Sequence, residues 1–325
     1  MFNGFLYRIR FSLIIINALI FSATAVAEDK ADTKKEAQFQ EHHENAKKYF
    51  KEGKYDETIE ELQKAVEIKK EDPELHYELG SVNDRTGNYL EALKSYEKGT
   101  SLDKNPNYIV LKRIGFIRYK IGDFEKAAES YEQCTKIKPD PDYQVYMNLG
   151  FSYYALKKYD DAIKNLKKSL ELKPKNPHPY YYLAKSYEKL ENYSEALKSY
   201  EKALLYEPNS YFTLNAVSWL FSTCPDEKYR NGKQAVIYAE RLNDFTKGQN
   251  SMYLDTLAAA YAEAGKFEDA VKTQEKALNF LIRSSAEKQA IEEFKVRLSS
   301  YKNKKPWRSV FSVKLINDKS SGKLP

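Results

Sequence analysis

The sequence contains few of the residues that build catalytic or metal sites. Only two cysteines and four histidines occur among 325 residues. The histidines show no spacing typical of a metal site, and the chain has neither a phosphate-binding glycine-rich loop nor a Gly-x-Ser-x-Gly motif. We therefore predict no metal ion, no cofactor and no catalytic residues.

The two cysteines, Cys134 and Cys224, lie far apart in the sequence. Free cysteine packs as a small hydrophobic residue, so we expect both side chains to be buried. Cys224 is followed by Pro225 and Asp226, two residues that commonly end a helix and start a turn. We interpret this triplet as a loop entry rather than as a reactive thiol site.

Long hydrophobic runs are absent except near the start of the chain. Two arginines precede an apolar run over residues 11–21, and Ala25-Val26-Ala27 follows it. This order is typical of a secretory signal peptide, here residues 1–27, cleaved after Ala27. A retained membrane anchor is the alternative, but the run is shorter than the roughly 20 residues that span a bilayer. No cysteine directly follows the cleavage site, so the sequence lacks the signal for a lipid anchor, and we expect a periplasmic or secreted protein. Residues 28–38 are expected to form a linker.

Charge of one sign does not dominate the body of the chain. The formal net charge is +6, but residues 301–325 hold seven lysines or arginines and a single aspartate. The positive charge therefore belongs to the tail, and we predict no nucleic-acid binding. The tail's Lys302, Lys304, Lys305, Trp307 and Arg308 suggest at most a weak contact with an anionic membrane surface.

What the sequence does contain is a repeat of about 34 residues. Small residues recur in three series, and the members of each series are 34 or 35 residues apart. The series are Ala46, Gly80, Gly115, Gly150 and Ala184; Thr58, Ala92, Ala127, Ala162 and Ala196; and Ala65, Gly99, Cys134, Ser169 and Ala203. Small residues are needed where two antiparallel helices approach closely, so each period predicts a helical hairpin.

Turn signals separate the small residues within each period. A turn followed by an aromatic recurs at Gly53/Tyr55, Gly87/Tyr89, Gly122/Phe124, Lys157/Tyr159 and Glu191/Tyr193. Prolines recur at Pro73, Pro106, Pro139, Pro174 and Pro208, where we expect the second helix of each period to stop. A single hairpin leaves one face uncovered, so stability must come from stacking of neighbouring hairpins.

This pattern resembles the tetratricopeptide repeat, as in Leu149-Gly150, Tyr153, Tyr159, Ala162, Leu166 and Pro174. The resemblance implies an all-α, right-handed superhelical solenoid of about seven antiparallel helix hairpins with a C-terminal capping helix. Five regular hairpins cover residues 39–210. A sixth, irregular hairpin covers 211–250, with about six extra residues at 225–230. A seventh covers 251–284, the cap covers 285–302, and 303–325 is expected to be a flexible basic tail.

The resemblance also implies a site, because first helices in this family line a concave, peptide-binding groove. The first-helix residues not needed for packing are Lys112, Phe116, Tyr119, Met147, Asn148, Phe151, Tyr154, Tyr181 and Lys185. Aromatic anchors with basic edges favour a protein or peptide partner, possibly with an acidic segment. The opposing interpretation is that these aromatics pack between hairpins.

We therefore predict a non-enzymatic, peptide-binding scaffold of the cell envelope. Two alternatives stay open at this point. The chain could be a structural protein that assembles with copies of itself, since the sequence does not give its oligomeric state. It could also be an enzyme with an unrecognised site near the irregular sixth hairpin.

Overall fold

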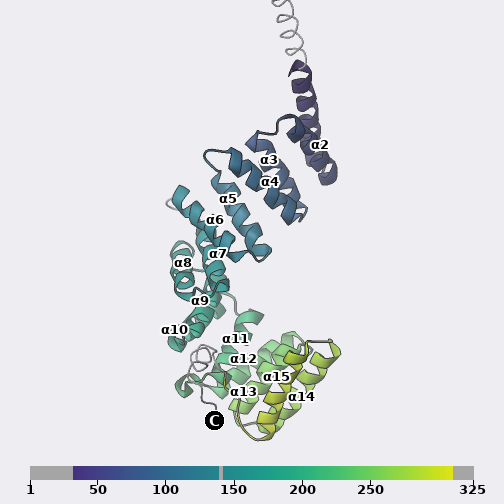
Figure 1. Ribbon diagram of the computed structural model, residues 1–325. Helices are drawn as coiled ribbons and strands as arrows, with labels where there is room; N and C mark the ends of the chain where they lie inside the picture. Colours follow the sequence, from purple (N-terminus) through teal and green to yellow (C-terminus); the bar gives the residue numbers. More distant parts are fainter. Residues whose placement is uncertain (1–31, 139–141, 310–325) are drawn as a thin grey trace, which may run out of the picture. The chain divides into compact units, whose positions relative to one another are not determined.

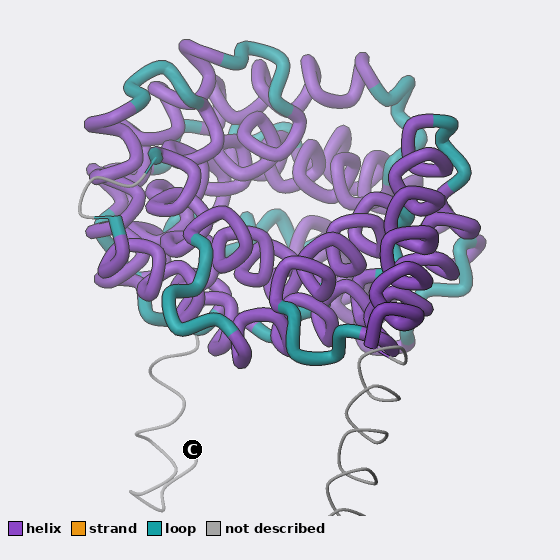
Figure 2. Tube along the Cα trace, turned by 90° about the horizontal axis from the view of Figure 1, so that it is seen from above, coloured by secondary structure: helices purple, strands orange, loops and turns teal. Residues whose placement is uncertain are grey.

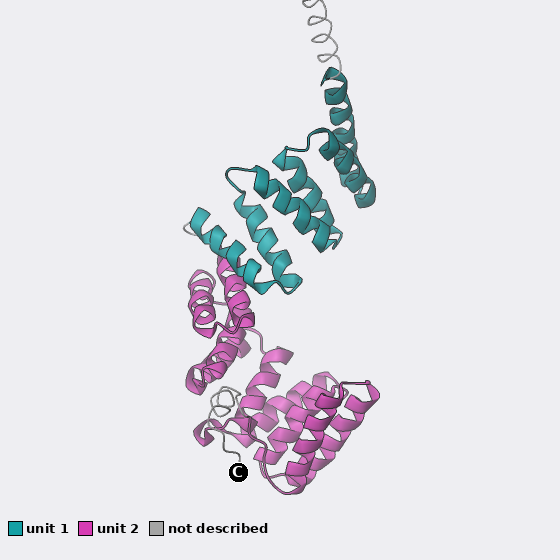
Figure 3. Cartoon of the chain, viewed as in Figure 1, with its two compact units in different colours: residues 1–139 teal, residues 140–325 magenta. Residues whose placement is uncertain are grey.

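A computed structural model of the protein describes residues 32–138 and 142–309. Every regular element in these residues is a helix (Figure 1; Figure 2), which confirms the all-α solenoid. No helix among them is long and apolar enough to cross a membrane. The predicted signal peptide lies outside the described residues. The chain divides into two compact units, residues 1–139 and 140–325 (Figure 3).

The first unit contains three hairpins. The first pairs a helix over residues 32–51 with α2 (Tyr55–Ile68). The next two pair α3 (Pro73–Arg85) with α4 (Tyr89–Leu102), and α5 (Tyr108–Lys120) with α6 (Phe124–Ile137).

The second unit contains four more hairpins and a last helix. The first two pair α7 (Tyr143–Ala155) with α8 (Tyr159–Leu172), and α9 (Pro177–Lys189) with α10 (Tyr193–Tyr206). The next two pair α11 (Tyr211–Thr223) with α12 (Gly232–Phe245), and α13 (Ser251–Glu263) with α14 (Phe267–Arg283). Helix α15 (Lys288–Lys302) follows and packs on α14.

Most first helices begin at an Asp or Asn whose side chain accepts a hydrogen bond from the backbone N–H two residues on. These caps are Asp72, Asn107, Asp142, Asn176 and Asn250. Such a cap satisfies a backbone donor that has no partner within the helix. Helices α8 and α10 end at Leu172 and Tyr206, two residues before Pro174 and Pro208, as expected, but Pro73 has a different role. Helix α2 already ends at Ile68, and Pro73 instead begins α3.

The small residues of the repeat lie where the helices of a hairpin meet. The second-helix alanines Ala92, Ala127, Ala162 and Ala196 have no exposed surface. Large rings fill the space beside them, and Tyr131 and Tyr200 are also fully buried. The close approach of the helices therefore follows from the small residues, and the aromatic residues supply the apolar surface that holds the hairpins together.

The turns inside the hairpins share one backbone conformation. Gly53, Gly87, Gly122 and Gly265 have φ between 75° and 86°, in the left-handed region. Lys157 and Glu191 occupy the same place with φ of 60° and 57°. Glycine adopts this conformation without steric cost, whereas a residue with a Cβ is strained there. The fourth and fifth hairpins therefore have the less favourable turns.

The sixth hairpin has a long connection between its helices. Residues 224–231 separate α11 from α12, where three residues suffice in the fifth hairpin, and they include the 3-10 turn η1 (Glu227–Tyr229). Arg230 holds this connection by donating to the carbonyl oxygens of Cys224 and Pro225 and to the carboxylate of Glu263. The segment predicted to be inserted is thus fixed to α13.

Helix α15 covers the end of the second unit with Phe294, Arg297 and Tyr301, all of which are buried. Residues 303–309, which follow α15, were expected to begin a flexible tail, and the structure differs from this expectation. Trp307 packs against the α13 and α15 cluster, and Arg308 pairs with Glu263 at 2.6 Å. Residues 303–309 therefore contact the array instead of forming the start of a flexible tail.

Candidate functional site

The predicted groove residues of the first unit lie on α5. Lys112, Phe116 and Tyr119 are all half-buried. The Arg113 guanidinium lies 4.6 Å from the centre of the Phe116 ring and pairs with the buried carboxylate of Asp84. The ion pair fixes the arginine over the ring, so this stretch of α5 presents an aromatic surface with its neighbouring cation already paired.

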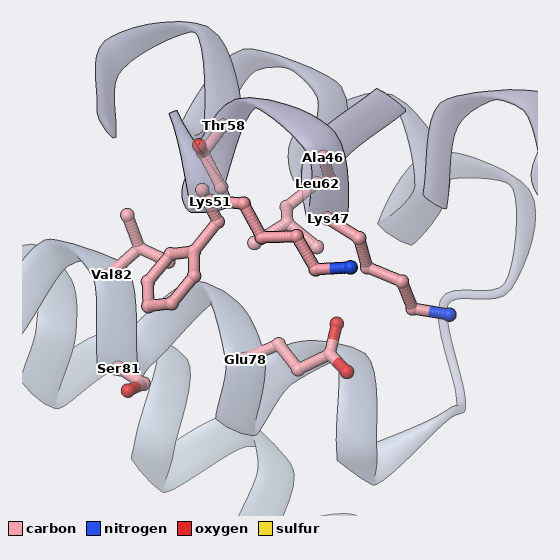
Figure 4. A pocket seen from close by; sticks show the side chains of 9 residues that line it. Ala46, Lys47, Lys51, Thr58, Leu62, Glu78, Ser81 and Val82 are labelled. Atoms are coloured by element: carbon pink, nitrogen blue, oxygen red, sulfur yellow. The ribbon is translucent and has the colours of Figure 1, made fainter. Parts of the chain in front are cut away.

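A cavity in this unit lies between the helix over residues 32–51, α2 and α3 (Figure 4). It holds about 260 Å³ and has a mainly apolar lining that includes Leu62 and Val82. The close-up shows the ammonium groups of Lys47 and Lys51 on the same side of this space as the Glu78 carboxylate. The carboxylate accepts a hydrogen bond from His43, or pairs with it, at 2.8 Å.

The second unit brings the predicted residues of α7 and α9 together. Met147, Asn148, Phe151 and Tyr154 lie on α7 and Tyr181 on α9, and all are half-buried. The rings of Phe151 and Tyr154 lie 4.2 and 5.3 Å from the ring of Tyr182, which lies beside Tyr181. We call Phe151, Tyr154, Tyr181 and Tyr182 the aromatic cluster.

Lys185 adds charge to this cluster, but its charge is balanced. Its ammonium donates to one carboxylate oxygen of Glu188 at 2.9 Å, and the other oxygen accepts from the hydroxyl of Tyr200 at 2.8 Å. Burial acts to lower the pKa of Lys185, but the Glu188 carboxylate outweighs burial and raises it. Burial also raises the pKa of Tyr154, to about 12. Lys185 is therefore charged and paired, and Tyr154 keeps its proton.

Both interpretations of these aromatics hold in part. The rings pack on one another between α7 and α9, as packing residues would, yet none of the cluster is fully covered. The sequence prediction omitted Tyr182 and Glu188. The spacing of three residues between Lys185 and Glu188 is a helical ion-pair signal that could have identified the second of these.

A cavity of about 590 Å³ continues from the aromatic cluster toward α11. Its lining includes Tyr181 and Tyr182 from α9 and Tyr211 and Phe212 from the start of α11. Phe212 is 71% exposed, so most of its ring is open to a binding partner. Aromatic walls next to the polar side chains of His178 and Asn209 form a surface on which another chain can bury apolar area and make hydrogen bonds.

The other chemically interesting residues have structural contacts. Both cysteine side chains are buried, as predicted, and burial raises the pKa of Cys224 to about 11. A thiol with so high a pKa is a poor nucleophile at neutral pH. His42 contacts Glu61 at 2.7 Å, and His76 contacts the carbonyl oxygen of Lys70 at 2.8 Å.

Comparison with known proteins identifies the repeat. Models described as "TPR repeat" and "Tetratricopeptide repeat" match residues 46–87, 73–106, 113–141, 150–191 and 177–210. Among curated proteins, no sequence matches the chain.

Two solved structures are similar to parts of this chain. A tetratricopeptide repeat protein from Parabacteroides merdae has 19% identity and a TM-score of 0.55, with 82% of this chain and 99% of that chain covered. MamA from Desulfovibrio magneticus has 20% identity and a TM-score of 0.48, with 53% and 97% covered. The first likeness shows the fold, a helical solenoid. The matched repeats show that this chain is a tetratricopeptide repeat protein, a class of fold that is typically a protein-interaction scaffold.

Proposed function

We propose that the chain is a non-enzymatic scaffold that binds another protein in the cell envelope. A segment of the partner lies along the first helices α7, α9 and α11 of the second unit. The observation that carries this proposal is the continuity of the aromatic cluster with the cavity of about 590 Å³ between α9 and α11.

The mutual packing of the rings in the aromatic cluster favours binding. Its rings hold one another in place, so little conformational entropy is lost when a partner covers them. Aromatic side chains supply much of the binding energy at protein interfaces. An acidic partner segment has less support at Lys185, because that ammonium is already paired with Glu188. We therefore propose a partner that anchors itself with an apolar side chain in the cavity.

Export is the second part of the proposal, and it depends on the sequence of residues 1–27. The basic residues, the short apolar run and Ala25-Val26-Ala27 support a cleaved signal peptide. Terminal sequencing of the protein recovered from its own cells tests this part. A mature chain that begins at Glu28 would support export, and an uncleaved chain in the cytoplasm would rule it out.

The binding proposal is tested by affinity capture from an envelope extract with residues 28–325 as bait. Replacing Phe212 with Ser removes an exposed ring from the cavity and should leave the fold intact. If the ring is buried by the partner, its loss costs about 2 kcal/mol, which is roughly a thirtyfold loss of affinity.

Ile109→Ser is the matched control, because Ile109 is 68% exposed and lies on α5 outside this cavity. Partners identified by mass spectrometry should be lost with Phe212→Ser and kept with Ile109→Ser. Equal recovery with both variants would refute this binding face.

Self-association is a second candidate, favoured by the exposed apolar side chains of the second unit. Leu205 and Met252 are each 63% exposed, in addition to Phe212. Light scattering of residues 28–325 over a hundredfold range of concentration tests this alternative. A mass that stays at one copy throughout would eliminate it.

A further inference from the structure

The C-terminal residues of the described chain are bound to the first helix of the sixth hairpin. The backbone N–H of Ser309 donates to the carbonyl oxygen of Thr223 at 2.9 Å. Its hydroxyl accepts from the indole N–H of Trp219 at 3.0 Å and lies 2.8 Å from the hydroxyl of Thr223. Arg308 donates to the carbonyl oxygen of Ser222 and to Glu263. Five polar contacts thus fix two consecutive residues, and we call residues 303–309 the strap.

The strap lies on the same side of α11 as the cavity. Phe212, Asn215 and Trp219 are spaced by three and four residues, so their side chains form one stripe along α11. This stripe is the least buried part of the helix, since Phe212 is exposed and the other two are half-buried. Its start lines the cavity, and its end contacts Ser309.

The matching stripe on α9 carries predicted groove residues. One repeat of 34 residues earlier, the positions of Asn215 and Trp219 are held by Tyr181 and Lys185. The strap therefore occupies, on α11, the face that we propose for the partner on α9. A segment of the chain itself has the position of a ligand.

We propose that the chain continues from the strap along this face and that its own residues 310–317 occupy the cavity between α9 and α11. Phe311, Val313 and Leu315 alternate with Ser312 and Lys314. In an extended chain this alternation places the three apolar side chains on one side.

The segment is long enough to reach the cavity. Thr223, where the strap is bound, and Phe212, at the cavity, are separated by 11 residues of α11. At 1.5 Å per residue that distance is about 17 Å. The seven extended residues 310–316 span about 23 Å at 3.3 Å per residue.

The charges of the two surfaces are complementary. Glu207 is the carboxylate that lines the cavity. Residues 310–325 carry Lys314, Lys319 and Lys323 against a single acid, Asp318. A basic, apolar segment fits a cavity with aromatic walls and an acidic edge better than an acidic segment does.

The consequence is that the tail competes with any partner for this face. This regulatory role rests on the proposed function, but the contact of the tail with the cavity does not, and it can be tested without a partner. A tail tethered by a short linker has an effective concentration of about 1 mM. If its intrinsic Kd is about 0.1 mM, it lowers the affinity of a competitor about tenfold.

The first test places a photo-crosslinker, p-benzoylphenylalanine, at position 311 of the full chain. We expect crosslinks within one copy to residues 177–182 and 209–213, identified by peptide mass spectrometry. Adding Phe212→Ala should reduce their yield, whereas Ile109→Ala should not. Crosslinks that map to other surfaces, or that join two copies, would overturn the proposal.

The second test adds a labelled peptide of residues 310–325 to the full chain and follows fluorescence anisotropy. The triple variant Phe311→Ser, Val313→Ser, Leu315→Ser should bind the peptide about tenfold more tightly than the unchanged chain, because its own tail no longer competes. Equal affinity, or no binding to either, would overturn the proposal. Failure of partner capture with a positive result here would refute the proposed function alone.

Discussion

The buried ion pair at the end of the array gives the sharpest stability prediction. Arg297 on α15 donates to Asp255 on α13 at 2.8 Å, and Gln274 on α14 donates to the same oxygen at 2.7 Å. The side chains of Arg297 and Asp255 are only 9% and 8% exposed. The guanidinium also lies within 6.0 Å of the Phe294, Trp219 and Trp307 rings. One cation thus joins three helices and the strap.

Arg297→Met keeps most of the volume and removes the charge, so Asp255 is left buried without its cation. Breaking a buried pair in this way costs about 3–5 kcal/mol. The cost should depend on pH. Burial already raises the pKa of Asp255, and removal of Arg297 takes away the main influence that lowers it. The variant's carboxyl therefore binds a proton in the folded state at a pH where the unfolded chain does not.

The sign of the pH dependence follows from this difference. An acid with a raised folded-state pKa favours folding most at low pH, and this contribution is lost as the pH rises through the folded-state pKa. The destabilisation by Arg297→Met should therefore be small near pH 4.5 and reach its full size at pH 7. Urea unfolding followed by circular dichroism at several pH values measures it, and hydrogen exchange of α13 and α15 locates it.

Arg283→Met is the control, because Arg283 is an exposed residue at the end of α14. It should change the free energy of unfolding by less than 0.5 kcal/mol, a typical limit for surface substitutions. A loss below about 1 kcal/mol for Arg297→Met, or a loss that is the same at pH 4.5 and pH 7, would refute the reasoning.

Two further predictions concern the backbone. At Gly232 a Cβ would lie 2.6 Å from the backbone nitrogen of Ala264, which cannot move aside, so Gly232→Ala should cost at least about 2 kcal/mol. Gly150→Ala, whose closest contacts are with the Leu166 side chain, should cost less, and the reverse order in urea unfolding would contradict this account. Glu191→Gly should stabilise the chain by about 0.5–1 kcal/mol, because φ is 57° there. Gly87→Glu is its reciprocal control and should destabilise, and equal melting temperatures for both variants would argue against turn strain.

The hairpins were predictable because their signals are local. Small residues and turns recur every 34 or 35 residues, so each hairpin could be identified within its own period. The sixth hairpin was predictable for the same reason, since the shift in spacing reveals an insertion. The structure places the extra residues in the connection between α11 and α12, as expected.

The contacts at the C-terminal end could not be predicted in the same way. Arg297 and Asp255 are 42 residues apart, and Ser309 and Trp219 are 90 residues apart. No periodicity connects such residues, because the partners are set by how α15 and the strap return over the array. An aromatic and a basic residue such as Trp307 and Arg308 occur equally in packed segments and in solvated tails, so their residue types alone did not indicate a contact.

The proposed binding face could be predicted from the sequence only in part. Phe151, Tyr154, Tyr181 and Lys185 were chosen from their register, and the structure brings them together on α7 and α9. Phe212 was not chosen, and it lies three residues before Asn215, the α11 equivalent of Tyr181. The groove residues were selected by comparing equivalent positions in the regular repeats. The sixth hairpin departs from this period, so α11 was not included.

The strap also determines how the second unit responds to mechanical load. In a simple solenoid, a pull on the C-terminal end peels away the last helix and then each earlier one in turn. Here Ser309 is fixed to Thr223 and Trp219, and Arg308 to Glu263. Tension applied at the C-terminus is therefore transmitted to α11 and α13 before it reaches α15. Helices α12 to α15 lie within a loop that the hydrogen bonds of Ser309 to Thr223 and Trp219 close, so they cannot detach one by one until these contacts break.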